Sequence, residues 1–149
     1  MSISYNFTEK DSLKDILIRK DKHESIIKSK SSFGKILVYG LIALEVLIIN
    51  KRCTQVLILA QTKELVIHIQ HVIGNLSCEH KDLAVKCFIG ELSIEEDKTR
   101  AQKCHIAIAT PKIVRNLIEI GVLNVNQVKL LVLDEIDQNV DDISLKLPI

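Results

Sequence analysis

The sequence contains no tryptophan, two prolines and five glycines, and aromatic residues make up only 3% of its 149 positions. It also has little net charge, +1 at pH 7, which excludes a domain that is drawn to nucleic acid by bulk positive charge. Hydrophobic residues, mostly Ile, Leu and Val, make up 47% of the chain, enough to bury one core. This composition favours an α/β fold over a β-sandwich or a disordered chain.

The four cysteines are widely spaced and lack the close Cys or His pairing of a zinc site; they are Cys53, Cys78, Cys87 and Cys104. We interpret them as reduced thiols in the core. The chain opens with a polar segment without signal-peptide character, so we expect a cytoplasmic and nuclear protein. The apolar run 36–49 is shorter than the roughly 20 residues of a membrane span and contains Glu45. A buried helix is therefore expected, with no membrane partner.

Apolar, β-branched runs alternate with amphipathic stretches of helical length, a pattern typical of βαβ units. It predicts a mainly parallel sheet with helices on both faces. Five strands are expected, at 25–28, 55–60, 85–89, 104–109 and 130–133. Residues 1–24 are expected to form a lead segment with a short helix around Leu13, Ile16 and Leu17, and residues 25–149 to form the domain.

Three helix starts can be assigned from capping residues. Thr62 can cap the helix after the second strand, because its hydroxyl can accept a hydrogen bond from a first-turn amide. Ser93 and Glu96 have the spacing of a capping box. Thr110 and Pro111 suit the cap and the first position of a helix that runs to about residue 119.

The stretch 130–137 carries the clearest chemical signal, because four apolar residues run into Asp134, Glu135, Ile136 and Asp137. A buried parallel strand would deliver these carboxylates to the sheet edge where open α/β sheets bind ligands. An Asp at this position can hold Mg²⁺ through water, and the adjacent Glu can orient or deprotonate the water that attacks a γ-phosphate. Taken alone, the stretch is equally compatible with a strand that ends in a solvated acidic turn.

The segment 134–137 resembles the DExD form of the motif that defines DEAD-box RNA helicases, and three upstream segments resemble further motifs of that family in the family's order. These are 60–65, 88–91 and 109–113. Each departs from the family pattern, with Gln61 for Pro, Lys63 for Arg, Glu91 for the second Gly, and Lys112 and Ile113 for Gly and Arg. The resemblance covers about residues 12–138. It implies the first RecA-like domain of a P-loop NTPase, truncated before its C-terminal strands.

The run 29–36 aligns with the family's phosphate-binding loop, in which glycines shape the backbone, a Lys reaches the phosphates and a hydroxyl binds Mg²⁺. The resemblance assigns the nucleotide to Ser31, Ser32, Gly34, Lys35 and Ile36. Ser32 replaces a Gly, Phe33 adds bulk, and Ile36 replaces the Mg²⁺ hydroxyl. By itself, Gly-Lys after a serine-rich turn also suits an ordinary loop. ATP and Mg²⁺ are the implied cofactors, bound weakly, and the Gln that reads adenine in the family is absent.

The resemblance also implies roles for the other motif residues. Lys35, Asp134 and Glu135 would be catalytic, Asp134 would hold Mg²⁺ through water, and Asp137 would couple the domain to a second one. The RNA backbone would be contacted by Lys63, Gly90, Thr110 and Lys112, through amides, hydroxyls and cations that do not read bases. The alternative for each lysine is a solvated surface charge.

Within the family, the segments 96–100 and 103–107 are similar to the helicase subunit of the survival-motor-neuron (gemin) complex. This similarity implies ribonucleoprotein-assembly proteins as partners, in addition to RNA. Two functions stay open. One is an ATP-dependent RNA helicase domain that is catalytically impaired as this chain, because the phosphate loop is altered and a second domain supplies an arginine. The other is a non-catalytic RecA-like scaffold. The order of the motifs disfavours an unrelated flavodoxin-like domain.

Overall fold

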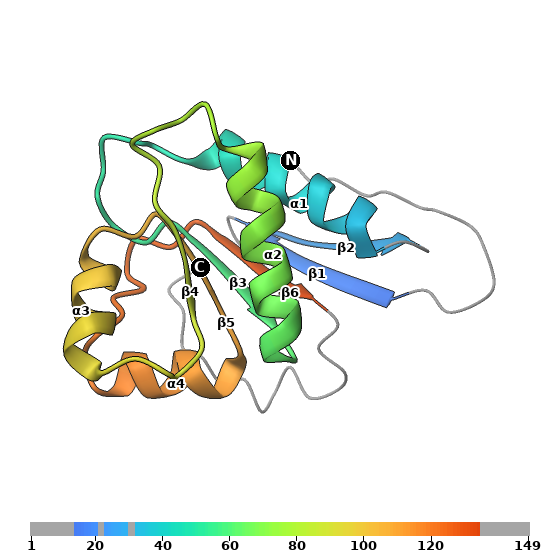
Figure 1. Ribbon diagram of the computed structural model, residues 1–149. Coiled ribbons are helices and arrows are strands. Elements are labelled where there is room, and N and C mark those ends of the chain that lie inside the picture. Colours follow the sequence, from blue (N-terminus) through green and yellow to red (C-terminus); the bar gives the residue numbers. More distant parts are fainter. Residues whose placement is uncertain (1–13, 21–22, 30–31, 135–149) are drawn as a thin grey trace.

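The structure, a computed structural model, describes residues 14–20, 23–29 and 32–134, with side chains from Gly34 onward. The elements in chain order are β1 (Lys14–Lys20), β2 (His23–Ser29), α1 (Ser32–Val46), β3 (Val56–Ala60), α2 (Lys63–Leu76), β4 (Val85–Phe88), α3 (Ile94–Gln102), β5 (Ile106–Ala109), α4 (Pro111–Glu119) and β6 (Leu130–Asp134). One sheet runs through the molecule, with the helices packed against it (Figure 1).

The sheet has the strand order β2-β1-β6-β3-β5-β4. Strands β6, β3, β5 and β4 are parallel to one another, whereas β1 is antiparallel to both of its neighbours, β2 and β6. The predicted α/β fold with a mainly parallel sheet is therefore confirmed. All five predicted strands are present, and their ends lie within two residues of the predicted ends. The segment predicted as the first strand, 25–28, lies at one end of the sheet as β2.

The short helix expected near the start of the chain is wrong, because residues 14–20 form strand β1. This strand pairs with β2 along seven residues, from Lys14 opposite Ser29 to Lys20 opposite His23. It also pairs with β6 along five residues. The segment contains the β-branched residues Ile16 and Ile18, and pairing on both sides outweighs its weak helical pattern. Residues 14–20 thus belong to the same sheet as the strands that follow.

The sheet buries apolar side chains on both faces. In β3, Val56 and Ile58 belong to the cluster packed under α1 and α2, whereas Leu57 and Leu59 belong to the cluster packed against α4 and the end of α3. Both sets are fully buried. Because side chains alternate along a strand, a strand covered on both faces is apolar at every position, as β3 is. The predicted placement of helices on both faces is confirmed.

The predicted helix starts agree with the structure. The hydroxyl of Thr62 accepts a hydrogen bond from the backbone N–H of Leu65 at 3.2 Å. Ser93 and Glu96 form the complete capping box, with reciprocal hydrogen bonds. Thr110 is the cap residue of α4 and Pro111 its first residue, although the Thr110 side chain makes no capping hydrogen bond. Helix α1 begins at Ser32 rather than at Ile36, so the segment expected to be a loop provides its first turn.

Two expectations about burial hold only in part. Cys87 and Cys104 are buried free thiols as predicted, but Cys78 is exposed in the turn after α2, and Cys53 is half-buried. Helix α1 covers the sheet with Tyr39 and Ala43 fully buried, yet Leu41 on its outer side is 58% exposed.

Within the described residues, no helix is long and apolar enough to cross a membrane, and no group of three or more His, Cys, Asp or Glu side chains could hold a metal ion.

Candidate functional site

The topology brings the end of β2 and the end of β6 to the same edge of the sheet. Both strands are antiparallel to β1, so they point in the same direction. The register sets Ile27, Ile16, Asp134 and Ala60 in one row across four strands. The chain leaves this row through Ser29 and enters α1 at Ser32 (Figure 1). Lys35 and Asp134 therefore lie at the same edge, as the sequence predicts.

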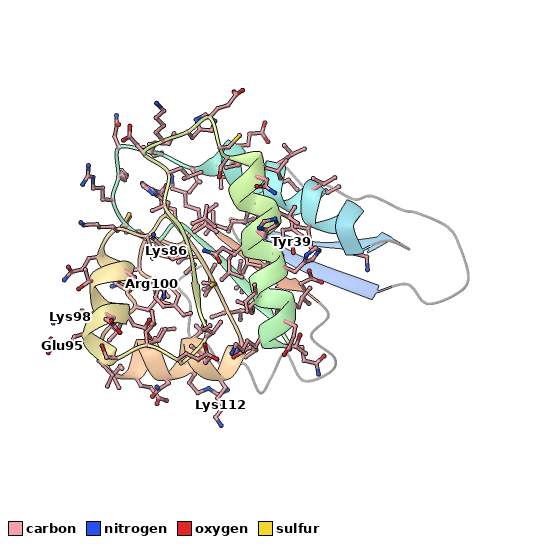
Figure 2. The ribbon with its side chains drawn as sticks, in the orientation of Figure 1. Tyr39, Lys86, Glu95, Lys98, Arg100 and Lys112 are labelled. Atoms are coloured by element: carbon pink, nitrogen blue, oxygen red, sulfur yellow. The ribbon has the colours of Figure 1, made fainter. Side chains whose placement is uncertain are left out.

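Helix α1 makes a direct contact with Asp134 at this edge. The hydroxyl of Tyr39 donates a hydrogen bond to Asp134 Oδ2 at 2.8 Å, and both side chains are buried. Lys35 lies one helical turn before Tyr39, on the same side of the helix, and is 1% exposed. Tyr39 (labelled in Figure 2) was missed by the sequence analysis, although its spacing of four residues from Lys35 is the signal that could have found it.

Ile36 occupies the position where the family's phosphate loop has the Mg²⁺ hydroxyl. Its side chain is fully buried in the apolar cluster beneath α1 and α2. The described residues therefore supply a lysine and a carboxylate for a nucleotide and its metal, but this position supplies no oxygen ligand. Magnesium prefers an octahedral shell of oxygens, so the described part of the chain does not complete a phosphate-loop magnesium site.

The remaining residues predicted for the nucleotide are only partly described. Ser32 lies in the first turn of α1, and Gly34 follows in the same turn and is half-buried. The predicted roles of Ser31, Glu135 and Asp137 fall outside the described residues.

The residues predicted to contact RNA lie at the same edge, around the ends of β3, β4 and β5. Lys63 is the first residue of α2 and forms an exposed ion pair with Glu91. Gly90 follows β4 with φ of +77°, a conformation that favours glycine. A Cβ at this position would be 3.6 Å from the side chain of Ile113 on α4. The turn after β4 therefore lies between the starts of α2 and α4.

Helix α4 adds the other two predicted RNA residues. Its first turn has backbone N–H groups without helical partners, the usual feature of a helix start. Thr110 precedes that turn with a hydroxyl that makes no capping hydrogen bond. Lys112 is exposed and points outward from the helix (Figure 2). The structure thus brings Lys63, Gly90, Thr110 and Lys112 to one edge, and their contact with RNA stays a prediction.

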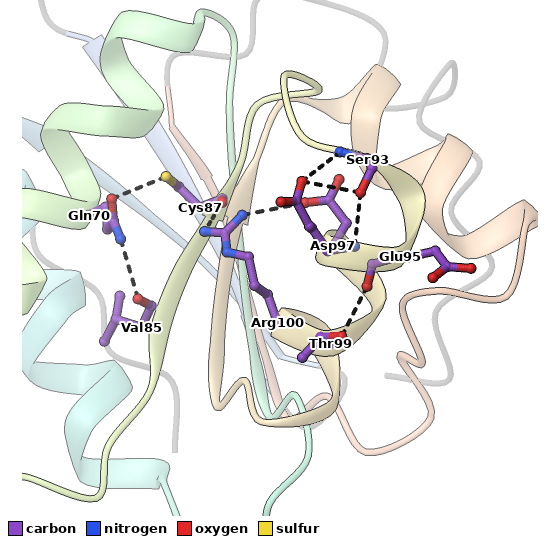
Figure 3. A network of polar contacts seen from close by, with 9 residues as sticks. Gln70, Val85, Cys87, Ser93, Glu95, Asp97, Thr99 and Arg100 are labelled. Carbon is purple, nitrogen blue, oxygen red and sulfur yellow. Dashed lines mark hydrogen bonds and ion pairs between the residues drawn. The ribbon is translucent and has the colours of Figure 1, made fainter.

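A polar network anchors α3 to β4, the strand that leads to Gly90 (Figure 3). Arg100 donates a hydrogen bond to the carbonyl oxygen of Cys87 at 2.7 Å and contacts the buried carboxylate of Asp97 at 3.4 Å. Its guanidinium lies over the Phe88 ring, 5.2 Å from the centroid. On the other side of β4, the Gln70 amide contacts both the strand backbone and the Cys87 thiol. This network fixes the end of β4, and no sequence motif indicated it.

Taken together, the parallel sheet covered on both faces, with Lys35 and Asp134 at its carboxyl edge, defines a RecA-like nucleotide-binding fold. The DEAD/DEAH box helicase family model matches residues 9–146. The chain belongs to the DEAD/DEAH box helicase family. Over 130 residues it is 38% identical to the mouse protein named probable ATP-dependent RNA helicase DDX20, a match that covers 87% of this chain.

Solved structures agree with this assignment. A DEAD box protein from the hyperthermophile Methanococcus jannaschii matches 64% of the chain with a TM-score of 0.59 at 25% identity. The yeast DEAD-box splicing factor Prp28 matches 67% with a TM-score of 0.55 at 30% identity. The chain spans 16% of the length of the mouse relative, and 26% and 25% of these two structures.

Proposed function

We propose that this chain is a nucleotide- and RNA-binding domain of the ATP-dependent RNA helicase class, with impaired ATP binding. The observation that carries the proposal is the hydrogen bond between Tyr39 and Asp134 at the carboxyl edge of the sheet, one helical turn after the buried Lys35. A lysine there can neutralise phosphate charge, and an Asp at the end of a buried strand is suited to hold a metal through water. The similarity of the mouse relative, named as ATP-dependent, supports the same class of ligand.

We propose that ATP binding is impaired because the altered residues weaken the binding of Mg²⁺ and change the phosphate-binding loop. Ile36 packs into the core, and its side chain has no oxygen for Mg²⁺. The Tyr39 hydroxyl uses one oxygen of Asp134, which leaves less of that carboxylate for a hydrated metal. In this family a second domain supplies a transition-state arginine, as the resemblance implies. We therefore propose that the 149 residues by themselves do not hydrolyse ATP at a helicase-like rate.

The nucleotide half of the proposal is tested by titrating a fluorescent ATP analogue with Mg²⁺ and again with EDTA. We expect weak binding that is further weakened by Lys35→Met, which removes the charge but nearly conserves the buried volume. Asp134→Asn, which keeps the shape of the side chain, should reduce the difference between Mg²⁺ and EDTA. Submicromolar binding of ATP by the unmodified chain would show that the loop is not impaired.

The RNA-binding part of the proposal concerns contacts with the RNA backbone at the ends of β3, β4 and β5. We propose that the first turn of α4, the Thr110 hydroxyl and Lys112 bind phosphates without reading bases. Glu91 forms an ion pair with Lys63 and places a negative charge beside this surface. Binding to single-stranded RNA should therefore be weak, because the carboxylate both neutralises the lysine and repels phosphate.

Fluorescence anisotropy with a labelled single-stranded RNA tests this half. Glu91→Gln should strengthen binding, whereas Glu95→Gln should not, because Glu95 is an exposed acid on the outer side of α3 and serves as the matched control (Figure 2). Thr110→Val and Lys112→Gln should each weaken binding across all RNA sequences. Equal effects of the Glu91 and Glu95 substitutions would mean that only total charge matters and that this surface is not the RNA site.

The second candidate function is a non-catalytic scaffold in ribonucleoprotein assembly. Ile36 in the core favours it, and so does the similarity of 96–100 and 103–107 to the helicase subunit of the gemin complex. On this proposal the partners are ribonucleoprotein-assembly proteins, in the cytoplasm and nucleus. The test is co-elution of the chain with a purified gemin complex that lacks its helicase subunit, without nucleotide. Failure to co-elute would reject the scaffold function and leave the nucleotide proposal untouched.

A further inference from the structure

A cavity of about 570 Å³ opens at the sheet edge opposite to Lys35 and Asp134. Four cationic side chains line it: Arg52, Lys81, Lys86 and Lys103. Arg52 precedes β3, Lys86 lies near the start of β4, and Lys103 precedes β5, whereas Lys81 comes from the turn after α2. These are the amino ends of the parallel strands, so the cavity is separate from the proposed nucleotide and RNA edge. We propose that it binds a compact ligand bearing two or more phosphate groups.

The described residues that line this cavity do not balance its positive charge. Within the described part of the chain, Asp82 is the only acid among the lining residues. None of the four cations makes an ion pair within the described part of the chain, where the two ion pairs are Lys63 with Glu91 and Arg100 with Asp97. Like charges gathered around one cavity repel one another, and a multivalent anion would relieve that repulsion.

The backbone near the cavity does not require these cations. Helix α2 ends here, and cations often cap the carbonyl oxygens of a helix end. That role is already taken, because the Ser77 hydroxyl donates to Ile73 O at 2.9 Å and to Gly74 O at 3.3 Å. His105, also in the wall, accepts a hydrogen bond from the Ala84 amide at Nδ1, 3.0 Å away, and its Nε2 lies 2.9 Å from Ile49 O. The wall is thus fixed by its own hydrogen bonds.

The chemistry of the lining selects phosphate groups. Lysine ammonium groups bind phosphate as point charges, and Arg52 adds a planar fork that can hold two oxygens at once. The volume suits a small ligand. Apart from two histidines, none of the described lining residues has an aromatic ring, so they offer little surface on which bases could stack. A strand of RNA is therefore less suited to it than a free polyphosphate or a doubly phosphorylated peptide, which present the same chemistry.

The test is isothermal titration of the chain with sodium pyrophosphate. The double variant Lys81→Gln/Lys103→Gln removes two lining charges. The double variant Lys51→Gln/Lys98→Gln removes two exposed charges outside the cavity and is the matched control. We expect the cavity variant to bind at least about tenfold more weakly, because it loses two charge-assisted hydrogen bonds to phosphate. The control variant should bind as the unmodified chain does, and Lys35→Met measures any separate binding of pyrophosphate at the nucleotide edge.

Further titrations distinguish the source of the phosphates. A doubly phosphorylated peptide that binds more tightly than pyrophosphate, with the same loss in the cavity variant, would identify a protein as the source. A free polyphosphate is the source if the peptide binds no better. Thermal melting checks the fold. All substituted lysines in the two double variants are exposed, so the melting temperatures of the two variants should agree within a few degrees. If the cavity variant melts earlier, Arg52→Gln replaces it.

Four results would overturn the proposal. Pyrophosphate and the peptide could both fail to bind. The cavity and control variants could lose affinity equally, which would indicate a general charge effect. Lys35→Met could abolish pyrophosphate binding while the cavity variant retains it, which would place the ligand in the phosphate loop; loss of RNA binding alone in the cavity variant would likewise assign the surface to nucleic acid.

Discussion

Substitution of Ile36 tests whether this residue stabilises the core and weakens ATP binding, because it stands where the family has a Mg²⁺-binding hydroxyl. The side chain is fully buried in the cluster under α1 and α2, directly after Lys35. Ile36→Thr places a hydroxyl where the family has its Mg²⁺ ligand. Ile36→Val is the matched control, because valine has the shape of threonine but no hydroxyl. The difference between the two variants isolates the effect of one oxygen atom.

The expected magnitudes follow from burial. Removing one methylene group from a core isoleucine costs about 0.5–1.5 kcal/mol, which is the full effect expected for Ile36→Val. Ile36→Thr adds the burial of a hydroxyl, which costs about 1–3 kcal/mol more if it finds no partner. In a chain of this size each kcal/mol corresponds to about 2–4 °C in Tm. The threonine variant should therefore melt several degrees below the valine variant in the absence of ligand.

Urea unfolding measures the difference in stability between the two variants, and titration with the fluorescent ATP analogue measures the gain in ATP affinity. With Mg²⁺ the threonine variant should bind ATP more tightly than the valine variant, and with EDTA the two should be equal. Equal stability of the two variants would contradict an apolar environment at position 36. Equal affinity in Mg²⁺ would mean that a hydroxyl at this position does not reach the metal, and the explanation offered for weak ATP binding would fail.

Three further predictions concern the framework. Arg100→Ala should lower the free energy of unfolding by about 2–4 kcal/mol, because it removes a charged hydrogen bond to Cys87 O and a cation–π contact and leaves Asp97 buried without its partner. Urea unfolding would contradict this if the loss for Arg100→Ala were below about 1 kcal/mol, or if Arg100→Lys were no more stable than Arg100→Ala. Gly90→Ala should cost about 1–2 kcal/mol through its positive φ alone, since the Cβ has ordinary contact distances; an unchanged Tm would refute the turn geometry. Burial raises the pKa of Cys104 from 9.0 to about 12, so an alkylating reagent at pH 8 should modify the exposed Cys78 and spare Cys104. Because the unfolded thiol ionises first, stability should fall as pH rises from 9 toward 12, and Cys104→Ala should reduce that fall.

The sequence by itself determined the features that depend on neighbouring residues or on a regular local pattern of apolar side chains. The capping box of Ser93 and Glu96 is complete within four residues, and Thr62 caps the amide three positions on. The central strands were found because continuous apolar runs between helices require burial on both faces. Asp134 could be placed at the sheet edge for the same reason, since the strand before it is apolar throughout.

The tertiary structure decided what depends on distant partners. Strand β1 exists because β2 and β6 pair with both of its sides, and β6 lies more than 100 residues away in the chain. The hydroxyl of Tyr39 meets Asp134 across 95 positions. Glu91 neutralises Lys63 only because the turn after β4 and the start of α2 meet at one edge. Local patterns report the propensities of neighbouring residues, whereas these contacts depend on strand order and on which face each helix covers, and neither is encoded within a short window.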